Sequence, residues 1–365
     1  MLKSRLWRSL DEAIASSPGP LQAAIPRVRR AVLMVRYGHD TQARQELTAL
    51  HQLYFQHPQR ELGAWLHFAE GVAHYFSDFG ACDRDRLEKA ANMAAGCGQQ
   101  ELQALCGAWL CWFSVVRQDV SGSVTHALAT RALAAPEHHS ALGRVTLALA
   151  IAHDFNGSAA QAQAWYAQAR QHVLAEGDDV GQSALIYNSA AMRVAQARRA
   201  SLDGLAPARP EQMLGAESVQ HYDAAKQVTL LPELAPLLRA QLMVVAGDYA
   251  GAHALYAQHL LTGDSPGLTR FSGSLLADVA WCRVHLGERE LAIQQAEAAE
   301  LESAAEIAVD DRAVTWGRLV QVYTALGLTE RAEQAAIRAR IELDAYQAQQ
   351  RDWAAALLNA GLLTP

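Results

Sequence analysis

The sequence predicts an all-helical protein, a solenoid of about eight antiparallel helix pairs with a period of about 40 residues. Three observations predict this fold class. Alanine, leucine, glutamine and arginine, which favour helices, recur throughout, whereas runs of β-branched residues are few. Apolar residues recur every three or four positions, as on the buried stripe of a helix. A glycine followed by an alanine five residues later returns at a regular interval.

The first and last elements are expected to be capping helices, at residues 1–20 and 350–365, because a terminal repeat otherwise exposes its stacking face. The surplus residues between the fourth and sixth junctions are assigned to a proline-rich insertion at residues 200–212. Helix pairs fill the intervening chain. Their junctions are placed near residues 38, 80, 118, 157, 202, 247, 287 and 327.

The recurring pattern of a glycine and an alanine five residues later has a physical reason. The glycine ends one helix in a left-handed conformation that side chains resist, so the next helix begins within a few residues. The alanine five residues on lets two helices cross closely. The predicted junction residues are Gly38, Gly80, Gly157, Gly247, Gly287 and Gly327, with Ala43, Ala162, Ala252, Ala292 and Ala332.

Composition and motifs exclude several functional classes. The chain has 365 residues, of which 51% are apolar and 19% are charged, with a formal charge of −7. This balance excludes a disordered chain and a basic nucleic-acid-binding protein. Only three lysines are present, none of them in a P-loop motif, and no G-x-G-x-x-G follows a strand-like run. We therefore expect neither a P-loop hydrolase nor a dinucleotide fold, and no cofactor.

The sequence also predicts a cytoplasmic protein. Residues 1–8 are charged and are followed by acidic residues, not by the apolar core of a signal peptide. The longest nearly apolar run, residues 104–116, is shorter than the roughly 18 residues that a membrane helix needs. The five cysteines form no C-x-x-C pair, which is typical of reduced, packed thiols. No membrane contact is expected.

The segment Gly247-Asp248-Tyr249-Ala250-Gly251-Ala252, with Tyr256 four residues further on, resembles the signature of the tetratricopeptide repeat superfamily. The period is longer than usual for that family and is similar to the long repeats of the maltose-regulon transcription activator and related bacterial regulators. The resemblance covers most of the chain and is weakest around residues 80–125 and 200–215. It implies one right-handed superhelical domain over residues 1–365, whose concave groove is lined by the first helix of each pair.

The resemblance also implies which residues line the groove. The family's groove positions fall 13, 10 and 6 residues before Gly80, and 6 residues before the other junctions. A tryptophan there would anchor a peptide, because it supplies a large apolar area at small entropic cost. The alternative is that Trp112 and Trp281 pack between helices, and both interpretations stay open. The candidates for partner binding are His67, Glu70, His74, Trp112, Ile151, Gln241, Trp281 and Gln321.

Two patterns raise the question of chemistry. His67, Glu70 and His74 share one helix face, and two imidazoles with a carboxylate can hold a divalent metal. The spacing is not H-E-x-x-H and no further ligand is evident, so a polar stripe is preferred and no metal is expected. Residues 263–267 match G-x-S-x-G, but they follow a helical run instead of a strand, which favours a turn over a nucleophile elbow. No catalytic residue is expected.

These patterns favour a non-enzymatic interaction scaffold that binds a peptide or a partner helix in its concave groove, in bacterial regulation or signalling. The alternative is a ligand-sensing module that takes a small ligand and acts with a separate output protein, of the transcription-regulator or diguanylate-cyclase type. A remote alternative is a metalloprotein or enzyme that uses His67, Glu70 and His74. The expected partner is a protein or peptide and not nucleic acid, and a homodimer is left open.

Overall fold

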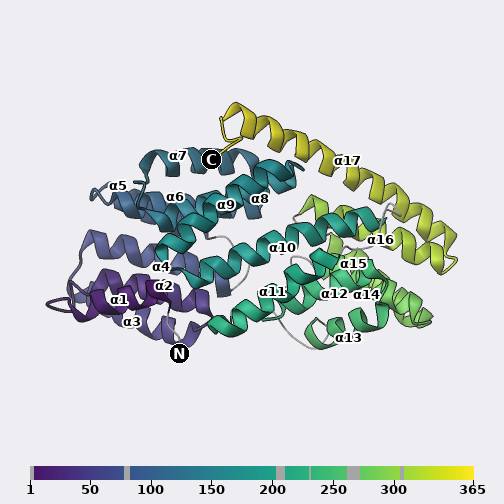
Figure 1. Ribbon diagram of the computed structural model, residues 1–365, viewed down its shortest axis with the longest axis horizontal. Coiled ribbons are helices and arrows are strands. Elements are labelled where there is room, and N and C mark those ends of the chain that lie inside the picture. Colours follow the sequence, from purple (N-terminus) through teal and green to yellow (C-terminus); the bar gives the residue numbers. More distant parts are fainter. Residues whose placement is uncertain (1–3, 78–82, 203–209, 230–231, 261–271, 305–307) are drawn as a thin grey trace. The chain divides into compact units, whose positions relative to one another are not determined.

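The protein is all-helical in the part of the chain that the computed structural model describes, residues 4–77, 83–202, 210–229, 232–260, 272–304 and 308–365. These residues contain 17 helices and no strand (Figure 1). The predicted fold class is confirmed at this level. The helices are α1 (Arg5–Ala15), α2 (Ala24–Tyr37), α3 (Asp40–Gln56), α4 (Arg60–Ser77), α5 (Arg84–Ala95), α6 (Gln100–Val116), α7 (Val120–Leu133), α8 (His139–Phe155), α9 (Ala159–Glu176), α10 (Asp179–Leu202), α11 (Pro210–Lys226), α12 (Leu234–Ala246), α13 (Tyr249–His259), α14 (Ser272–His285), α15 (Arg289–Ser303), α16 (Val309–Ala325) and α17 (Thr329–Asn359).

The helices contact one another in a repeat-like order. α2 packs against α3 and α4, α4 packs against α5 and α6, and α6 packs against α7 and α8. The same pattern returns where α12 packs against α13 and α14, and α14 against α15 and α16. The first helix of a pair thus contacts its own second helix and the first helix of the next pair (Figure 1).

The two helices of a pair are joined at the residues that the recurring glycines predict. The described junction glycines have φ between 70° and 88°, in the left-handed region that side chains disfavour. Gln118 stands at a junction without a glycine and also has a positive φ, of 56°. Gly80 lies outside the described residues. The glycines with positive φ at predicted junctions are Gly38, Gly157, Gly247, Gly287 and Gly327.

The alanine that follows each junction glycine is mostly a packing residue. Ala43, Ala162, Ala252 and Ala292 are at most 1% exposed, whereas Ala332 is only partly buried. A methyl side chain at a helix crossing lets two helices approach closely, because the interaxial distance depends on the side chains at the contact.

The chain divides into two compact units, each with buried aromatic residues of its own. In unit 1, Trp165 is fully buried, and in unit 2 Tyr323 is fully buried. The expectation of a single domain over residues 1–365 stays a prediction. Unit 1 comprises Met1–Leu185, Tyr222–Leu231 and Trp353–Pro365, and unit 2 comprises Ile186–His221 and Pro232–Asp352.

The N-terminal helix α1 packs onto α2 within unit 1. It begins after Ser4, whose hydroxyl accepts a hydrogen bond from the backbone N–H of Trp7 at 3.1 Å. Trp7 is buried edge-on against Tyr37, with 5.4 Å between ring centroids. The Leu6 backbone N–H donates to the carbonyl of Gly177 at 3.2 Å. These contacts fix α1 on α2 and on the end of α9.

The C-terminal segment differs from the expected separate cap at residues 350–365. It begins as the last part of α17, because residues 329–352 contain no glycine or proline that would end the helix. Trp353 is fully buried, and the Leu362 carbonyl accepts a hydrogen bond from His153 Nε2 at 2.8 Å. Of the expected insertion, residues 203–209 lie outside the described part of the chain.

Unit 2 contains a buried charged cluster. The Asp278 carboxylate, which is fully buried, pairs with Arg198 Nη2 and Arg318 Nε, each at 2.9 Å. The Tyr256 hydroxyl donates to the same carboxylate at 3.3 Å. Burial and the Asp278 charge raise the pKa of Tyr256, so its hydroxyl stays protonated and can donate. One carboxylate therefore bridges two guanidiniums inside the unit.

The cysteines and the helix hydropathy agree with a packed interior. Cys97, Cys106, Cys111 and Cys282 carry free thiols, and Cys82 lies outside the described residues. Burial raises the pKa of Cys111 to about 12, which keeps its thiol protonated. Within the residues searched, none of the helices combines the length and the apolar character of a membrane span.

Candidate functional site

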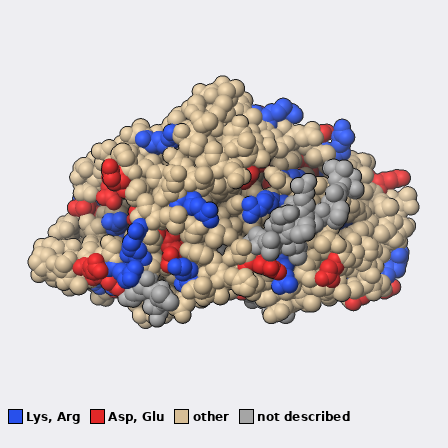
Figure 2. Space-filling model, in the orientation of Figure 1, with Lys and Arg blue, Asp and Glu red and all other residues tan. Residues whose placement is uncertain are grey.

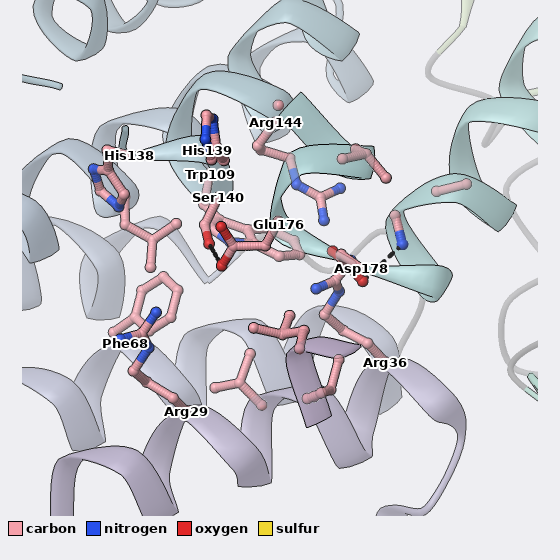
Figure 3. Close-up of a pocket in the computed structure, with 18 of the residues that line it drawn as sticks. Arg29, Arg36, Phe68, Trp109, His138, His139, Ser140, Arg144, Glu176 and Asp178 are labelled. Carbon is pink, nitrogen blue, oxygen red and sulfur yellow. Dashed lines mark hydrogen bonds and ion pairs between the residues drawn. The ribbon is translucent and has the colours of Figure 1, made fainter. Parts of the chain in front are cut away.

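A cavity of unit 1 lies among the first helices of successive pairs, and we call it the unit 1 pocket (Figure 3). Residues of α1, α2, α4, α6, α8 and α10 line it, together with the end of α9. Its free volume is about 80 Å³, which is room for several waters or one small chemical group. Its wall includes Arg29, Arg36, Trp65, Trp109, Arg144 and Asp178.

Helical spacing brings the pocket residues to one side of each helix. Arg29 and Arg36 are seven residues apart on α2, and Trp65 and Phe68 are three apart on α4, so each pair shares a face. On α8, Arg144 is a charged residue beside an apolar stretch: residues 145–152 are all buried and, apart from Thr146, apolar. The walls are therefore mostly apolar, and the arginine side chains project from them into the pocket.

Arg144 is the distinctive cation of the pocket. Its guanidinium carbon lies 4.0 Å from the ring centroid of Trp109 and 5.4 Å from that of Trp112. Among the described residues, none forms a hydrogen bond or ion pair with this guanidinium. Burial lowers the pKa of Arg144, and the nearby Arg36 charge lowers it further, against the opposing effect of Asp178. Figure 3 shows the side chain pointing into the pocket.

Arg36 differs from Arg144 because it has a carboxylate partner. Its Nη2 lies 2.6 Å from Asp178 Oδ2, and each side chain is only 11% exposed. Asp178 Oδ1 also accepts a hydrogen bond from the Gly181 backbone N–H at 2.9 Å, at the start of α10. This carboxylate is therefore fully engaged by α2 on one side and α10 on the other.

Arg29 is a second guanidinium without an ion pair among the described residues. It lies over Trp65, with 5.9 Å from the guanidinium carbon to the ring centroid. Its neighbours Arg27 and Arg30 are instead paired with Glu46, at 2.8 and 3.2 Å. Burial alone would raise the pKa of Glu46, but the two guanidiniums outweigh it and lower the pKa. On the face shown in Figure 2, charges of both signs are likewise interspersed.

The remaining polar groups of the pocket bind one another. The Ser140 hydroxyl donates to Glu176 Oε1 at 2.6 Å, a contact drawn in Figure 3. His138 Nε2 lies 3.8 Å from a Glu101 carboxylate oxygen. Burial lowers the pKa of His138, while the carboxylate of Glu101 opposes this shift. The Nδ1 atoms of His139 and His172 are 3.1 Å apart, so one of these rings donates a hydrogen and the other accepts it.

The candidates His67, Glu70 and His74 lie on α4 but do not line the unit 1 pocket. Glu70 accepts a hydrogen bond from His51 Nε2 at 2.7 Å, and it also pairs with Arg86. Its distance to His67 Nδ1 is 3.8 Å. His51 and Arg86 belong to α3 and α5, so these polar side chains link α4 to the second helices of two pairs.

His74 lies near the carboxylate of Asp83 and not near that of Glu70. Its Nδ1 lies 3.7 Å from Asp83 Oδ2. No group of three His, Cys, Asp or Glu side chains within the searched part of the chain is arranged to hold a metal ion. Burial lowers the pKa of His67, with a further contribution from Lys89.

The other candidates are divided between the two units. In unit 1, Trp112 is buried and donates from Nε1 to the Tyr75 hydroxyl at 3.0 Å, and Ile151 is buried in α8. In unit 2, Trp281 packs edge-on against His285, with 4.5 Å between centroids, and Gln321 Oε1 accepts from Arg318 Nη1 at 2.6 Å. Gln241 is partly buried on α12.

Sequence reasoning missed the residues that the pocket brings together. Arg144 carried a usable signal, because it is the one charge inside the apolar run 141–152. A guanidinium in such a run needs either a buried carboxylate or an opening in the wall. The contact of Arg36 with Asp178 had no such signal, since 142 residues separate the two positions.

As a whole, the unit 1 pocket offers apolar walls, two guanidiniums, Arg29 and Arg144, without a carboxylate partner among the described residues, and a set of mutually bonded polar groups. This arrangement suits the binding of a negatively charged group. No protein-family model matches the chain, and no curated protein sequence gives a significant match.

Proposed function

We propose that this chain is a non-enzymatic binding protein of the helical-repeat type, similar to the tetratricopeptide repeat superfamily. Its helix pairs would stack as a right-handed solenoid, and it would bind a peptide or partner helix in bacterial regulation or signalling. Two features support the repeat assignment. First helices contact the next first helix at α2–α4, α4–α6, α6–α8, α12–α14 and α14–α16, and positive φ values recur at the junctions, including Gln118. Such a scaffold binds on surfaces built from successive repeats.

The observation that carries the binding function is Arg144 in the unit 1 pocket. Its guanidinium is partly exposed within the pocket and has no carboxylate partner among the described residues, so its N–H groups are open to an anionic ligand. The walls around it come from consecutive pairs, as the scaffold proposal requires. One acidic side chain of a partner segment would fit the pocket, with the remainder of that segment on the surface outside.

A second candidate function, a small-ligand sensor, is favoured by the dimensions of the pocket. The free volume is about 80 Å³, and Leu6 and Leu10 of α1 form part of the wall. A whole helix does not fit into such a volume, but a small molecule does. A sensor of this kind would act with a separate output protein.

The experiment is capture from an extract of the source cells with immobilised protein. The variants are wild type, Arg144→Gln and the matched control Arg131→Gln. Arg131 also lies over a tryptophan, 5.3 Å from the centroid of Trp165, but it is exposed and does not line the pocket. Eluates are analysed for proteins and for small molecules by mass spectrometry.

We expect a protein or a small molecule that wild type and Arg131→Gln retain and Arg144→Gln loses. A protein supports the scaffold, and a small molecule supports the sensor. Identical eluates from all three proteins would overturn the proposal that this pocket binds anything. Circular dichroism of each variant checks that the loss is not a loss of fold.

A further inference from the structure

We infer that the unit 1 pocket binds a small organic monocarboxylate, whose carboxylate pairs with the Arg144 guanidinium and whose apolar body lies against Trp109. The inference rests on the proposed binding function and names the class of ligand.

The ligand is negatively charged because the Arg144 guanidinium lies partly exposed in the pocket with no acceptor among the described residues. Trp109 covers the guanidinium at 4.0 Å from carbon to ring centroid, and Trp112 lies at 5.4 Å. Stacking on a ring uses the flat face of a guanidinium and leaves its N–H edge free. No described residue accepts a hydrogen bond from that edge. A carboxylate fits it, since its two oxygens match two parallel N–H groups.

The ligand carries one negative charge because acidic residues share the pocket. Asp178, Glu176 and Glu101 all line it. Asp178 is neutralised by Arg36, and Glu176 is held by the Ser140 hydroxyl, but each carboxylate keeps its own charge. Arg29, Arg36 and Arg144 also line it, so the six charges cancel formally, and a monoanion leaves a smaller excess of negative charge than a dianion such as a phosphate monoester. This favours a carboxylate over a phosphate.

The ligand is organic and small because of the walls and the volume. Leu105, Leu147, Phe68 and Trp109 give the space an apolar lining, which inorganic anions do not use. The free space of about 80 Å³ accommodates a short branched chain or a single ring beside the carboxylate, not a polymer.

The test is calorimetric titration of the full chain with a matched panel: benzoate, 4-methylpentanoate, benzamide and inorganic phosphate. Benzamide has nearly the shape of benzoate without the charge. The proteins are wild type, Arg144→Gln, Arg144→Lys and Arg131→Gln. We expect wild type and Arg131→Gln to bind at least one of the two carboxylates, more tightly than benzamide or phosphate.

Arg144→Gln is expected to weaken carboxylate binding by about 10- to 100-fold, the usual effect of losing a charged hydrogen-bond pair. It should leave benzamide binding unchanged, which a general loss of structure would not do. Arg144→Lys is expected to be intermediate, because an ammonium keeps the charge but not the two parallel donors. Higher salt should weaken carboxylate binding in wild type.

Three results would overturn the inference: no binding of either carboxylate, equal binding of benzoate and benzamide, or no effect of Arg144→Gln. The capture experiment separates this failure from failure of the proposed function. If Arg144→Gln still loses a partner from the cell extract, the binding function stands and only the ligand class is wrong. If the eluates are also identical, both are wrong.

Discussion

Arg36, near the end of α2, and Asp178, just before α10, form an ion pair at 2.6 Å across 142 residues of sequence. Beside it, the Thr229 backbone N–H donates to the Tyr37 carbonyl at 3.0 Å. Within unit 1, the end of α2 therefore contacts Asp178, just before α10, and Thr229, just after α11. Arg36 and Asp178 both line the unit 1 pocket, so their ion pair forms part of its wall.

We predict that Arg36→Gln lowers the free energy of unfolding of unit 1 by about 2 kcal/mol, because it leaves the Asp178 carboxylate mostly buried with no cation. Asp178→Asn should cost a similar amount while keeping an oxygen for the Gly181 N–H. Urea denaturation of both single variants and of the double variant measures the coupling. The exposed pair Arg340–Asp344 on α17 is the control, where Arg340→Gln should change stability by less than about 0.5 kcal/mol. Additive effects of the two pocket substitutions would contradict the prediction.

We predict a larger effect for Asp278→Asn in unit 2. The substitution leaves Arg198 and Arg318, each 3% exposed, without the carboxylate that both share. Removing one member of a buried ionic cluster costs about 3–5 kcal/mol, because the remaining charges are not solvated. The measurement is the free energy of unfolding from urea denaturation. Glu297→Gln, which breaks the exposed pair with Arg331, is the matched control and should have little effect.

The helix pairs could be predicted because local chemistry determines their ends. A glycine such as Gly247 takes a left-handed φ that few residues tolerate, so it marks a junction wherever it recurs. The long helix α17 could not be predicted from the same rule. Residues 329–352 contain neither a stop signal nor a strong cap, and the expected boundary near residue 350 came from the need for a terminal cap.

The candidate site was less predictable than the fold, because it depends on the rotation of each helix. On α4, the pocket faces Trp65 and Phe68, whereas the transferred groove position was His67. One residue along a helix turns a side chain by about 100°, so a small error in register places it on another face. On α6, the transferred position Trp112 packs against Tyr75, and Trp109, three residues earlier on the same face, lines the pocket.

At the Gln118 junction we predict a substitution that stabilises the protein, whereas most substitutions destabilise. Its φ of 56° is left-handed, which costs a residue with a Cβ about 1 kcal/mol. Gln118→Gly should therefore stabilise the protein by about 0.5 kcal/mol, after the greater entropy of glycine in the unfolded chain is subtracted. Thermal denaturation measures the change.

The reverse substitution, Gly247→Ala, tests the same backbone effect in unit 2. An added Cβ there would meet no atom within 4 Å, so any loss comes from the φ of 85° and not from a clash. We expect a destabilisation of about 1 kcal/mol, measured by the shift of the thermal midpoint. An unchanged midpoint would show that the junction does not depend on the left-handed conformation.

His153 predicts how stability depends on pH. The ring is fully buried, and Nε2 carries the hydrogen because its partner, the Leu362 carbonyl at 2.8 Å, only accepts. Nδ1 is buried with no hydrogen-bond partner among the described residues, so a proton added there would be unsolvated. Burial accordingly lowers the pKa of His153, and the hydrogen bond to Leu362 opposes this only in part.

The sign follows from proton linkage. Between the lowered pKa of the folded state and the ordinary value of about 6.5, the unfolded chain binds more protons, so stability rises with pH. We expect the thermal midpoint of wild type to fall as the pH decreases through about 6.5. His153→Gln, whose amide can still donate to Leu362, should show a smaller fall, and the exposed His57→Gln should behave as wild type. An equally steep fall in His153→Gln would assign the pH dependence to other groups.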